Sequence, residues 1–478
     1  MKSHTYKLLG MAALMLGLTQ SCKDFTDLNS PTVVNRDNYF NRESDMTAAV
    51  NGMYASLRGY YNNYFIVAEV PSDNTEANNG NLAYSDVDQQ TWLNNNTYFQ
   101  ALWLNSYSVI SRANIILDKI DAVPMADNLK KQYKGEALFV RSLMYLHLAQ
   151  FFGDVPLILK EVKTEAEAYS YLREPVTKIY AQLETDLIAA AEGLPPTYTG
   201  ANVGRVPKGA AQALLGKLYL VTKQFGKAVP VLKAVKDAGI YGLLDDYGQV
   251  FSVLNRNNRE ILYSVQYLGN GNGEGSSFCI RFAPFGSGTE ITTGAFPTGS
   301  NQGTEDLYAA FEADDIRRPV AIERYATTGA LYTRKFLDRP IANNEGKNNW
   351  PVLRYADVLL MYAEALNETG ATGEAIKPLN EVRKRANLED APDNGQVDLR
   401  KVIQHERRVE LCFEGHRWLD LLRTGTMLEV MRAYKEQYKG VGYLVENYEI
   451  KDRNVLFPIP FRERSLNPKL TQNTGYDQ

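Results

Sequence analysis

Most of this chain carries apolar residues at three- and four-residue spacings, the period of an amphipathic α-helix. The pattern predicts helices over 44–60, 100–121, 136–146, 175–191 and 397–437. The third is stopped near Gly153 and Pro156, and the fourth has Pro175 in its first turn. An extended segment, 456–460, follows the last helical stretch. The sequence therefore predicts a mainly α fold.

Two further stretches, 208–238 and 356–386, are predicted to be helical hairpins of one template. In the first, the positions that carry the pattern are Leu215, Gly216, Tyr219, Gly226, Ala228, Leu232 and Val235. In the second they are Tyr362, Ala363, Leu366, Gly370, Gly373, Ala375, Leu379 and Val382. Small residues where two helices cross match the tetratricopeptide repeat. We therefore expect an α-solenoid scaffold with a broad concave surface, typical of binding proteins.

Two segments break the helical pattern. Residues 61–99 are polar and rich in Asn, Asp, Tyr and Gly, and a loop of that length is usually functional or disordered. In 240–350, Ile261–Val265 is a candidate short strand, and 269–303 alternates glycines with aromatics. The second segment is predicted to be a large irregular insert with short strands, set into the helical scaffold.

The composition narrows the function classes. A net charge of −4, with no basic stripe, argues against nucleic acid and against a polybasic membrane patch. The 30 tyrosines exceed the 18 phenylalanines. Tyrosine combines a flat apolar face with a polar tip and suits amphipathic ligands such as sugars or peptides, but it also serves helix packing. Composition alone favours the packing role.

The N-terminus has the form of an export signal. Lys2 and Lys7 precede the apolar run Leu8–Leu18, which is too short to span a bilayer as a helix. The sequence Leu18–Cys22 resembles a bacterial lipobox, so Cys22 is the predicted lipidation site. The alternative is an ordinary cleavable signal with an incidental cysteine. We expect an exported, lipid-anchored protein that works outside the cytoplasm.

Metal and nucleophile motifs are not found. His147, His405 and His416 show no metal-ligand spacing, and the chain contains no Gly-x-Ser-x-Gly elbow or phosphate-loop lysine. Gly269–Gly273 superficially suggests a phosphate cradle, but no helix follows it, so a flexible loop is the better interpretation. No cofactor is predicted.

Three glutamates deserve a separate test as catalytic acids. Glu406, Glu410 and Glu414 recur every four residues beside arginines. Paired carboxylates can hydrolyse glycosides. Interleaved with arginines on one helix, they more plausibly form an ion-pair network that locks the C-terminal helices.

Two smaller questions stay open. Oxygens of 73–76 or 86–88 could bind a structural Ca²⁺, although solvated loop acids are the simpler interpretation. Cys279 and Cys412 could form a disulfide, although two unpaired buried thiols are favoured.

Taken in order, the motifs resemble the SusD/RagB family of outer-membrane lipoproteins over nearly the whole chain. The opening pattern is Cys22–Asp27 with Asn38–Phe40, and the helix pattern is Trp103, Tyr107, Ile110 and Asn114. A second helix and its stop are matched by Arg141, Tyr145, Phe152, Gly153, Val155 and Pro156. The most recognisable run is Arg354–Ala365, followed by Asn380–Arg383, Arg385–Ala386, Glu406–Arg408, Glu410–Leu411, Glu414–Arg417, Asp420–Leu421, Asn467–Pro468, Gln472–Asn473 and Gly475–Tyr476.

The resemblance implies a function that the residues alone only suggest. Family members sit on the outer face of the outer membrane and cap a SusC-like TonB-dependent transporter. They capture oligosaccharides, or in RagB-like members peptides, without catalysis. The resemblance also implies one unit divided into signal peptide 1–21, lipidated tether 22–43, N-terminal helical half 44–240, ligand-side insert 241–350 and C-terminal helical half 351–478.

Ligand residues in this family come from variable loops, so they are proposed here from the loops 61–99 and 269–303. The candidates for stacking and hydrogen bonding are Tyr64, Asp73, Asn74, Glu76, Asn78, Tyr84, Trp92, Asn96, Phe278, Arg281, Phe285 and Phe296. Alternatively, half or more of these aromatics hold their own loop in place. Trp103, Trp350 and Trp418 are predicted to be structural.

The loops and motifs distinguish three candidate functions. Glycan capture is favoured by the loops, which are more aromatic than charged. Peptide capture by the same architecture is the alternative. A lipoprotein glycosidase is disfavoured, because no suitable pair of acids is evident.

Overall fold

The structure is a computed structural model that describes residues 39–476, apart from 78–80, 294–295, 343–344 and 440–448. The predicted signal peptide, Cys22 and most of the predicted tether lie outside the described residues, as does Asn78. Among the described residues, none of the helices is long and apolar enough to cross a membrane.

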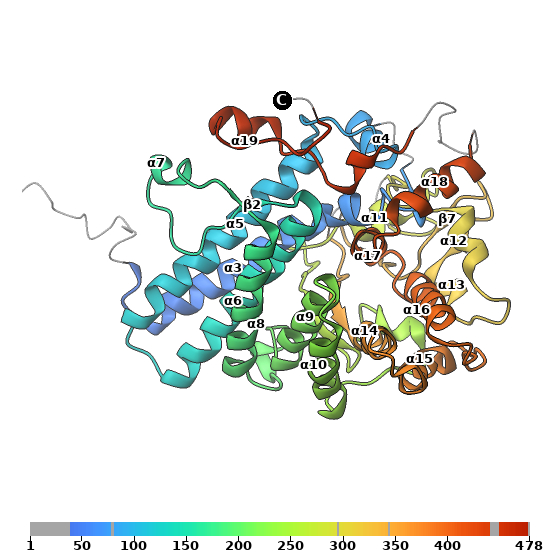
Figure 1. The fold of residues 1–478 in the computed structure, drawn as a ribbon, viewed down its shortest axis with the longest axis horizontal. Helices are drawn as coiled ribbons and strands as arrows, with labels where there is room; N and C mark the ends of the chain where they lie inside the picture. The colour runs from blue at the N-terminus through green and yellow to red at the C-terminus, as the bar shows by residue number, and fades with distance from the viewer. Residues whose placement is uncertain (1–38, 78–80, 294–295, 343–344, 440–448, 477–478) are drawn as a thin grey trace, which may run out of the picture.

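The scaffold is a continuous array of helices in which each packs on the next (Figure 1). In packing order these are α3 (Glu43–Ala68), α5 (Thr97–Lys119), α6 (Asp127–Phe152), α8 (Val176–Gly193), α9 (Lys208–Val221), α10 (Phe225–Asp237), α14 (Tyr355–Glu368) and α15 (Thr372–Arg385). An array built from nearest-neighbour contacts is the architecture of a solenoid. The prediction of a mainly α scaffold of helical hairpins is confirmed.

The hairpin α9–α10 shows why small residues were informative. A Cβ added at Gly216 would lie only 2.4 Å from Leu232 Cδ2, so the two helices approach each other at a position that only glycine fits. The hairpin α14–α15 turns at Gly370, whose φ of +84° is readily adopted only by glycine. Both hairpins occur where the sequence predicted them.

The insert lies between α10 and α14 in the sequence, and its first and last strands pair with each other. Strand β4 (Ile261–Val265) pairs antiparallel with β8 (Trp350–Arg354), with Val265 opposite Trp350. Between them lie short elements: α11 (Phe278–Phe282), β5 (Gln302–Gly303), α12 (Glu305–Ala310), α13 (Arg318–Ala321), β6 (Glu323–Arg324) and β7 (Leu331–Tyr332). The predicted short strand and irregular insert are both present.

The prediction that 61–99 forms one long loop is largely wrong. Helix α3 continues to Ala68, and the chain then forms β1 (Thr75–Glu76), which pairs with β5, and α4 (Leu82–Asp88). The last turns of α3 are helical because Tyr61, Tyr64 and Phe65 bury their rings in the core. The polar composition of this segment concealed an apolar helix face.

The remaining elements complete the C-terminal side and the connections. They are α16 (Gln396–Glu410), α17 (Arg417–Thr424), α18 (Met427–Gln437), α19 (Phe461–Leu466), β2 (Val155–Pro156), α7 (Glu165–Ala168) and β3 (Arg173–Glu174), with short 3-10 turns at 120–122, 200–202, 247–250 and 452–455. Helix α16 packs on α14 and α17 contacts α3, α6 and α9.

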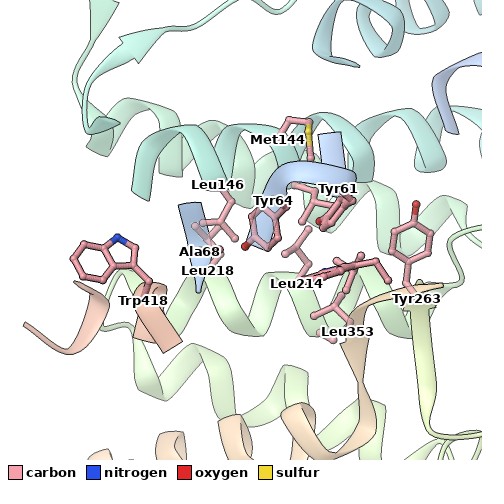
Figure 2. Packing of buried hydrophobic residues seen from close by; sticks show 14 of the residues in the cluster. Tyr61, Tyr64, Ala68, Met144, Leu146, Leu214, Leu218, Tyr263, Leu353 and Trp418 are labelled. Atoms are coloured by element: carbon pink, nitrogen blue, oxygen red, sulfur yellow. The ribbon is translucent and has the colours of Figure 1, made fainter. Parts of the chain in front are cut away.

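One core joins the two helical halves. Figure 2 shows Tyr61 and Tyr64 of α3 beside Met144 and Leu146 of α6, with Leu214 of α9 below them. Trp350 packs against the Tyr64 ring from the end of the insert, at a centroid distance of 6.0 Å. The predicted structural role of Trp103, Trp350 and Trp418 agrees with their burial.

A loop face built on the end of helix α3

The insert is fastened to the C-terminal part of α3 by one arginine. Arg281 Nη1 donates to the backbone oxygen of Asn62 at 2.7 Å and to Asn63 Oδ1 at 3.0 Å. The Arg281 guanidinium also lies 4.5 Å from the centroid of the Phe65 ring, a cation–π distance. Helix α11 is therefore held over the last turns of α3.

Two phenylalanines beside α11 face solvent: Phe285 follows the helix directly, and Phe296 lies in a second segment of the insert. Thr298 N donates to Ile280 O at 3.1 Å and Gly299 N to Ala283 O at 3.0 Å, which holds the segment next to the helix. A Cβ at Gly299 would lie 3.1 Å from Phe285 N, and its φ is +58°, so the position requires glycine. Phe285 is 65% exposed and Phe296 is 81% exposed.

We define the loop face as Phe285, Phe296, Arg281, Asn62 and Asn63. It offers two exposed apolar rings, a half-buried guanidinium and the amide nitrogens of the two asparagines, whose oxygens are buried in Asn62 and bonded to Arg281 in Asn63. Among the described residues, no carboxylate forms an ion pair with Arg281. Such a surface suits a ligand that has both apolar faces and hydroxyl or carbonyl groups. The sequence indicated Arg281 and the two phenylalanines, but not Asn62 and Asn63, because nothing in the local pattern distinguishes two asparagines on a helix.

Trp92 and Tyr84 lie in the core and do not reach the loop face. Trp92 is 1% exposed, packs edge-on against Trp418 and Phe457, and donates from Nε1 to Val87 O at 3.1 Å. Tyr84 is also buried, and its hydroxyl donates to Ser300 O at 2.5 Å. Both rings hold their own segment in place, which corrects the expectation that they stack on a sugar.

Tyr64 and Phe278 are likewise packing residues. The Tyr64 hydroxyl lies 3.3 Å from His147 Nε2 and 3.3 Å from Gly415 O, and burial raises the pKa of this tyrosine well above its usual value. Phe278 is fully buried against Trp350, at a centroid distance of 5.1 Å. Tyr64, Phe278, Tyr84 and Trp92 therefore follow the alternative interpretation, in which loop aromatics hold their own segment in place.

The polar candidates of the first loop are also mostly internal. Burial alone would raise the pKa of Asp73, but the charges of Arg408 and Arg417 outweigh it and lower the pKa to about 2. Asn74 Oδ1 accepts from Arg408 Nε at 2.8 Å. Asn96 caps α5 by accepting from Tyr98 N at 2.9 Å. These groups are occupied by the fold, which corrects their assignment to sugar hydroxyls.

Glu76 is the exception, because it is only half-buried. Burial, and then the charge of Asp88, raise the pKa of Glu76 to about 7. Burial also raises the pKa of Asp88 to about 6. In the parts of the chain that the structure describes, no group of three acids, histidines or cysteines could hold a metal ion. Asp73, Asp86 and Asp88 are buried, which corrects the expectation that these loop acids are solvated.

Comparison with known proteins decides the family. Residues 264–476 match the sequence model of the SusD family, and residues 24–220 match a model described as starch-binding associating with outer membrane. The chain belongs to the SusD/RagB family. It is 26% identical over 525 residues to SusD-like protein P25 of Formosa agariphila, covering 95% of this chain and 97% of that protein.

Solved structures agree with this assignment. A laminarin binding SusD-like protein is 28% identical, with a TM-score of 0.79, covering 91% of this chain and 100% of that one. A SusD homolog from Bacteroides thetaiotaomicron shares the fold at a TM-score of 0.82 and 24% identity, covering 93% of this chain and 99% of that one. The SusD-like fold is thereby confirmed. The family consists of non-catalytic binding proteins associated with the outer membrane, so this SusD-like chain is a binding protein and not an enzyme.

The three spaced glutamates of this SusD-like chain lie in a buried charge cluster. Glu406, Glu410 and Glu414 are inaccessible to solvent. Glu406 and Glu410 lie on α16 and Glu414 just after it, and their partners all come from other segments: Arg317, Lys335, Arg354, Arg383 and Arg385. The interpretation as an ion-pair network is confirmed, although the arginines adjacent in sequence are not the partners.

The two cysteines within the described residues are buried and unpaired. Burial raises the pKa of Cys279 to about 11 and that of Cys412 to about 12. Both thiols are therefore protonated and unreactive in the folded protein at neutral pH.

Proposed function

We propose that this SusD-like protein captures oligosaccharides on its loop face at the cell surface and delivers them to a SusC-like TonB-dependent transporter. The observation that carries the proposal is the exposure of Phe285 and Phe296 on the insert, in a protein that buries its other candidate loop aromatics. Two solved relatives support the ligand class: one is described as laminarin binding, and the other is a surface glycan-binding protein A from Bacteroides thetaiotaomicron in complex with laminarihexaose.

The chemistry of the loop face fits a sugar chain. A pyranose ring presents C–H groups on its faces and hydroxyls around its edge, which match phenyl rings and amide or guanidinium groups respectively. Covering one exposed phenylalanine fully contributes about 1.5–3 kcal/mol. Two such contacts and a few hydrogen bonds contribute roughly −8 kcal/mol before the costs of association and ordering are subtracted, so the expected net Kd is weaker than micromolar.

Anchoring through Cys22 belongs to the same proposal. The lipobox-like sequence Leu18–Cys22 supports it, and the family's association with the outer membrane is consistent with it. Cys22→Ser should abolish incorporation of labelled palmitate and release the protein from the membrane fraction. A membrane-bound, unlabelled Cys22→Ser variant would contradict the anchor.

The binding test compares glycans with peptides. The lipid-free protein from residue 23 onward is titrated by calorimetry with laminarihexaose, maltohexaose and a mixture of tryptic peptides. We expect a hexasaccharide to bind, and the variant Phe285→Ala/Phe296→Ala to lose at least about tenfold in affinity. Phe461→Ala on α19 is the control, because this phenylalanine is also exposed but lies outside the loop face.

Each outcome has a clear meaning. Peptide binding without glycan binding would replace the ligand with peptides, as in RagB-like capture. Glycan binding that is equal in wild type and in the double variant would remove the loop face as the site. Cleavage of any bound glycan would contradict the assignment as a binding protein.

A further inference from the structure

A cleft on another part of the protein has the properties of a second ligand site. It has a volume of about 560 Å³ and lies where the C-terminal ends of α6 and α9 and the first turns of α8 face α17 and α18. Small-molecule sites occupy about 300–1,000 Å³ and favour junctions between structural units. None of the loop-face residues lines this cleft.

The cleft is lined by a largely buried glutamine whose amide has no protein partner among the described residues. Gln150 lines it and is only 9% exposed, yet neither amide atom forms a hydrogen bond with a described residue. Other buried amides nearby are satisfied: Asn473 Nδ2, for example, donates to Phe152 O at 3.0 Å and to Phe457 O at 2.7 Å. The amide atoms keep contact with solvent, so water can bond to them in the free protein, and a ligand that covers the cleft must replace those hydrogen bonds.

A tyrosine on the α8 wall has the same property. The half-buried Tyr180 lines the cleft, and its hydroxyl has no hydrogen-bond partner among the described residues. Burial raises the pKa of Tyr180 well above its usual value, so the hydroxyl keeps its proton and can donate. Its ring offers an aromatic face within the cavity.

The other residues that line the cleft are partly apolar and partly polar, a combination that favours a sugar as the ligand. Val176, Leu422, Met427 and Leu428 make apolar walls. Asp154 and Lys223 add an acceptor and a donor, and Lys223 forms no ion pair with a described residue. A purely apolar ligand would leave the Gln150 amide unpaired, which costs about 1–3 kcal/mol. A sugar ring has an apolar face and hydroxyls that both donate and accept.

The size of the cleft sets the length of the ligand. Gln150, Val221 and Arg423 also line an inner chamber of only about 40 Å³, whose other walls include Lys217 and His416. That chamber has room for water but not for a sugar ring. Ligand must therefore remain in the outer cleft, with Gln150 at its inner end.

We propose that this cleft is a second saccharide site for one or two sugar rings, stacked on Tyr180 and hydrogen-bonded to Gln150. It would hold a short saccharide independently of the long chain on the loop face. The proposal does not rest on the loop face, because the two sets of residues are separate.

The test uses a background in which the loop face is disabled. The Phe285→Ala/Phe296→Ala variant is examined by saturation-transfer NMR with maltose, cellobiose and laminaribiose as probes, and affinities are then measured by titration. We expect at least one disaccharide to bind this variant as well as it binds wild type. Adding Tyr180→Ala or Gln150→Ala should weaken that binding by about tenfold or more.

The controls distinguish a site from general damage. Tyr169→Ala removes an exposed tyrosine that does not line the cleft and should leave binding unchanged. Tyr180→Phe keeps the ring and removes only the hydroxyl, so it serves if Tyr180→Ala lowers the melting temperature. The proposal is overturned if no disaccharide binds the loop-face variant, or if binding there survives both Gln150→Ala and Tyr180→Phe unchanged. Failure of the loop-face proposal is recognised separately, by unchanged hexasaccharide binding in Phe285→Ala/Phe296→Ala.

Discussion

Arg354 Nη1 and Glu410 Oε1 lie 2.6 Å apart in the interior, with the two side chains 1% and 0% exposed. Arg354 ends strand β8, the last element of the insert, and Glu410 ends helix α16. Burial alone would raise the pKa of Glu410, but the charges of Arg385, Arg354 and Arg317 outweigh it and hold the pKa well below the usual range. The pair connects the insert to the C-terminal helices.

Removing the Glu410 charge should destabilise the protein strongly. Glu410→Gln leaves Arg354 and Arg317 short of a buried counter-charge, and breaking one partner of a buried pair typically costs about 3–5 kcal/mol. Urea denaturation followed by circular dichroism measures the change. Lys377→Ala is the control, because its pair with Glu374 is 68% and 65% exposed and should contribute less than about 1 kcal/mol. A loss of equal size in both variants would contradict the argument.

Glu76 should make the stability depend on pH. Its pKa rises from 4.5 in the unfolded chain to about 7 in the folded protein, because burial and Asp88 disfavour the charged form. The folded state therefore binds a proton more tightly, and the associated stability is complete below pH 4.5 and lost as pH rises through 7.

Glu76→Gln mimics the protonated acid. It should be about 1–3 kcal/mol more stable than wild type at pH 8 and equal to it at pH 4. Denaturant titrations of both proteins at the two pH values measure this. Glu374→Gln is exposed and should show no such difference. A variant less stable than wild type at pH 8 would refute the assigned burial effect.

The close crossing of α9 and α10 should not tolerate a side chain. Gly216→Val places methyl groups where Leu232 already lies, and overpacking of this kind costs about 1–3 kcal/mol. Thermal denaturation should show the decrease. Gly226→Ala is the matched control in α10, since a Cβ there meets nothing within 4 Å, and it should be neutral or stabilising by up to about 1 kcal/mol. Equal melting temperatures for the two variants would contradict the close approach.

Trp92→Ala should behave as a core mutation. The ring is enclosed by Phe99, Trp418 and Phe457, so its removal should cost about 3–5 kcal/mol. Affinity for a hexasaccharide should be unchanged in the fraction that remains folded. Phe285→Ala should show the reverse: an unchanged melting temperature and weaker binding. Weaker binding by a fully stable Trp92→Ala would return this residue to the site.

Some segments of this fold are predictable from the sequence and others are not. Both tetratricopeptide-like hairpins and the strand at Ile261–Val265 were predictable, because local spacing and glycine positions encode them directly. The last turns of α3 were not, since asparagines between buried tyrosines resemble a loop when only composition is considered. Of the proposed ligand residues, Phe285 and Phe296 are exposed and Arg281 is half-buried, whereas Trp92 and Tyr84 are buried, because exposure is set by contacts between distant segments.

The sequence by itself determined the helical scaffold, the family motifs and the charged residues of the C-terminal half, since periodicity and spacing act over a few residues. Only the tertiary structure decided which groups face solvent. It placed Glu410 against Arg354, 56 positions apart, and enclosed Trp92 while leaving Phe285 free. Burial depends on where the chain folds back on itself, and neither a residue's type nor its neighbours in sequence specify that.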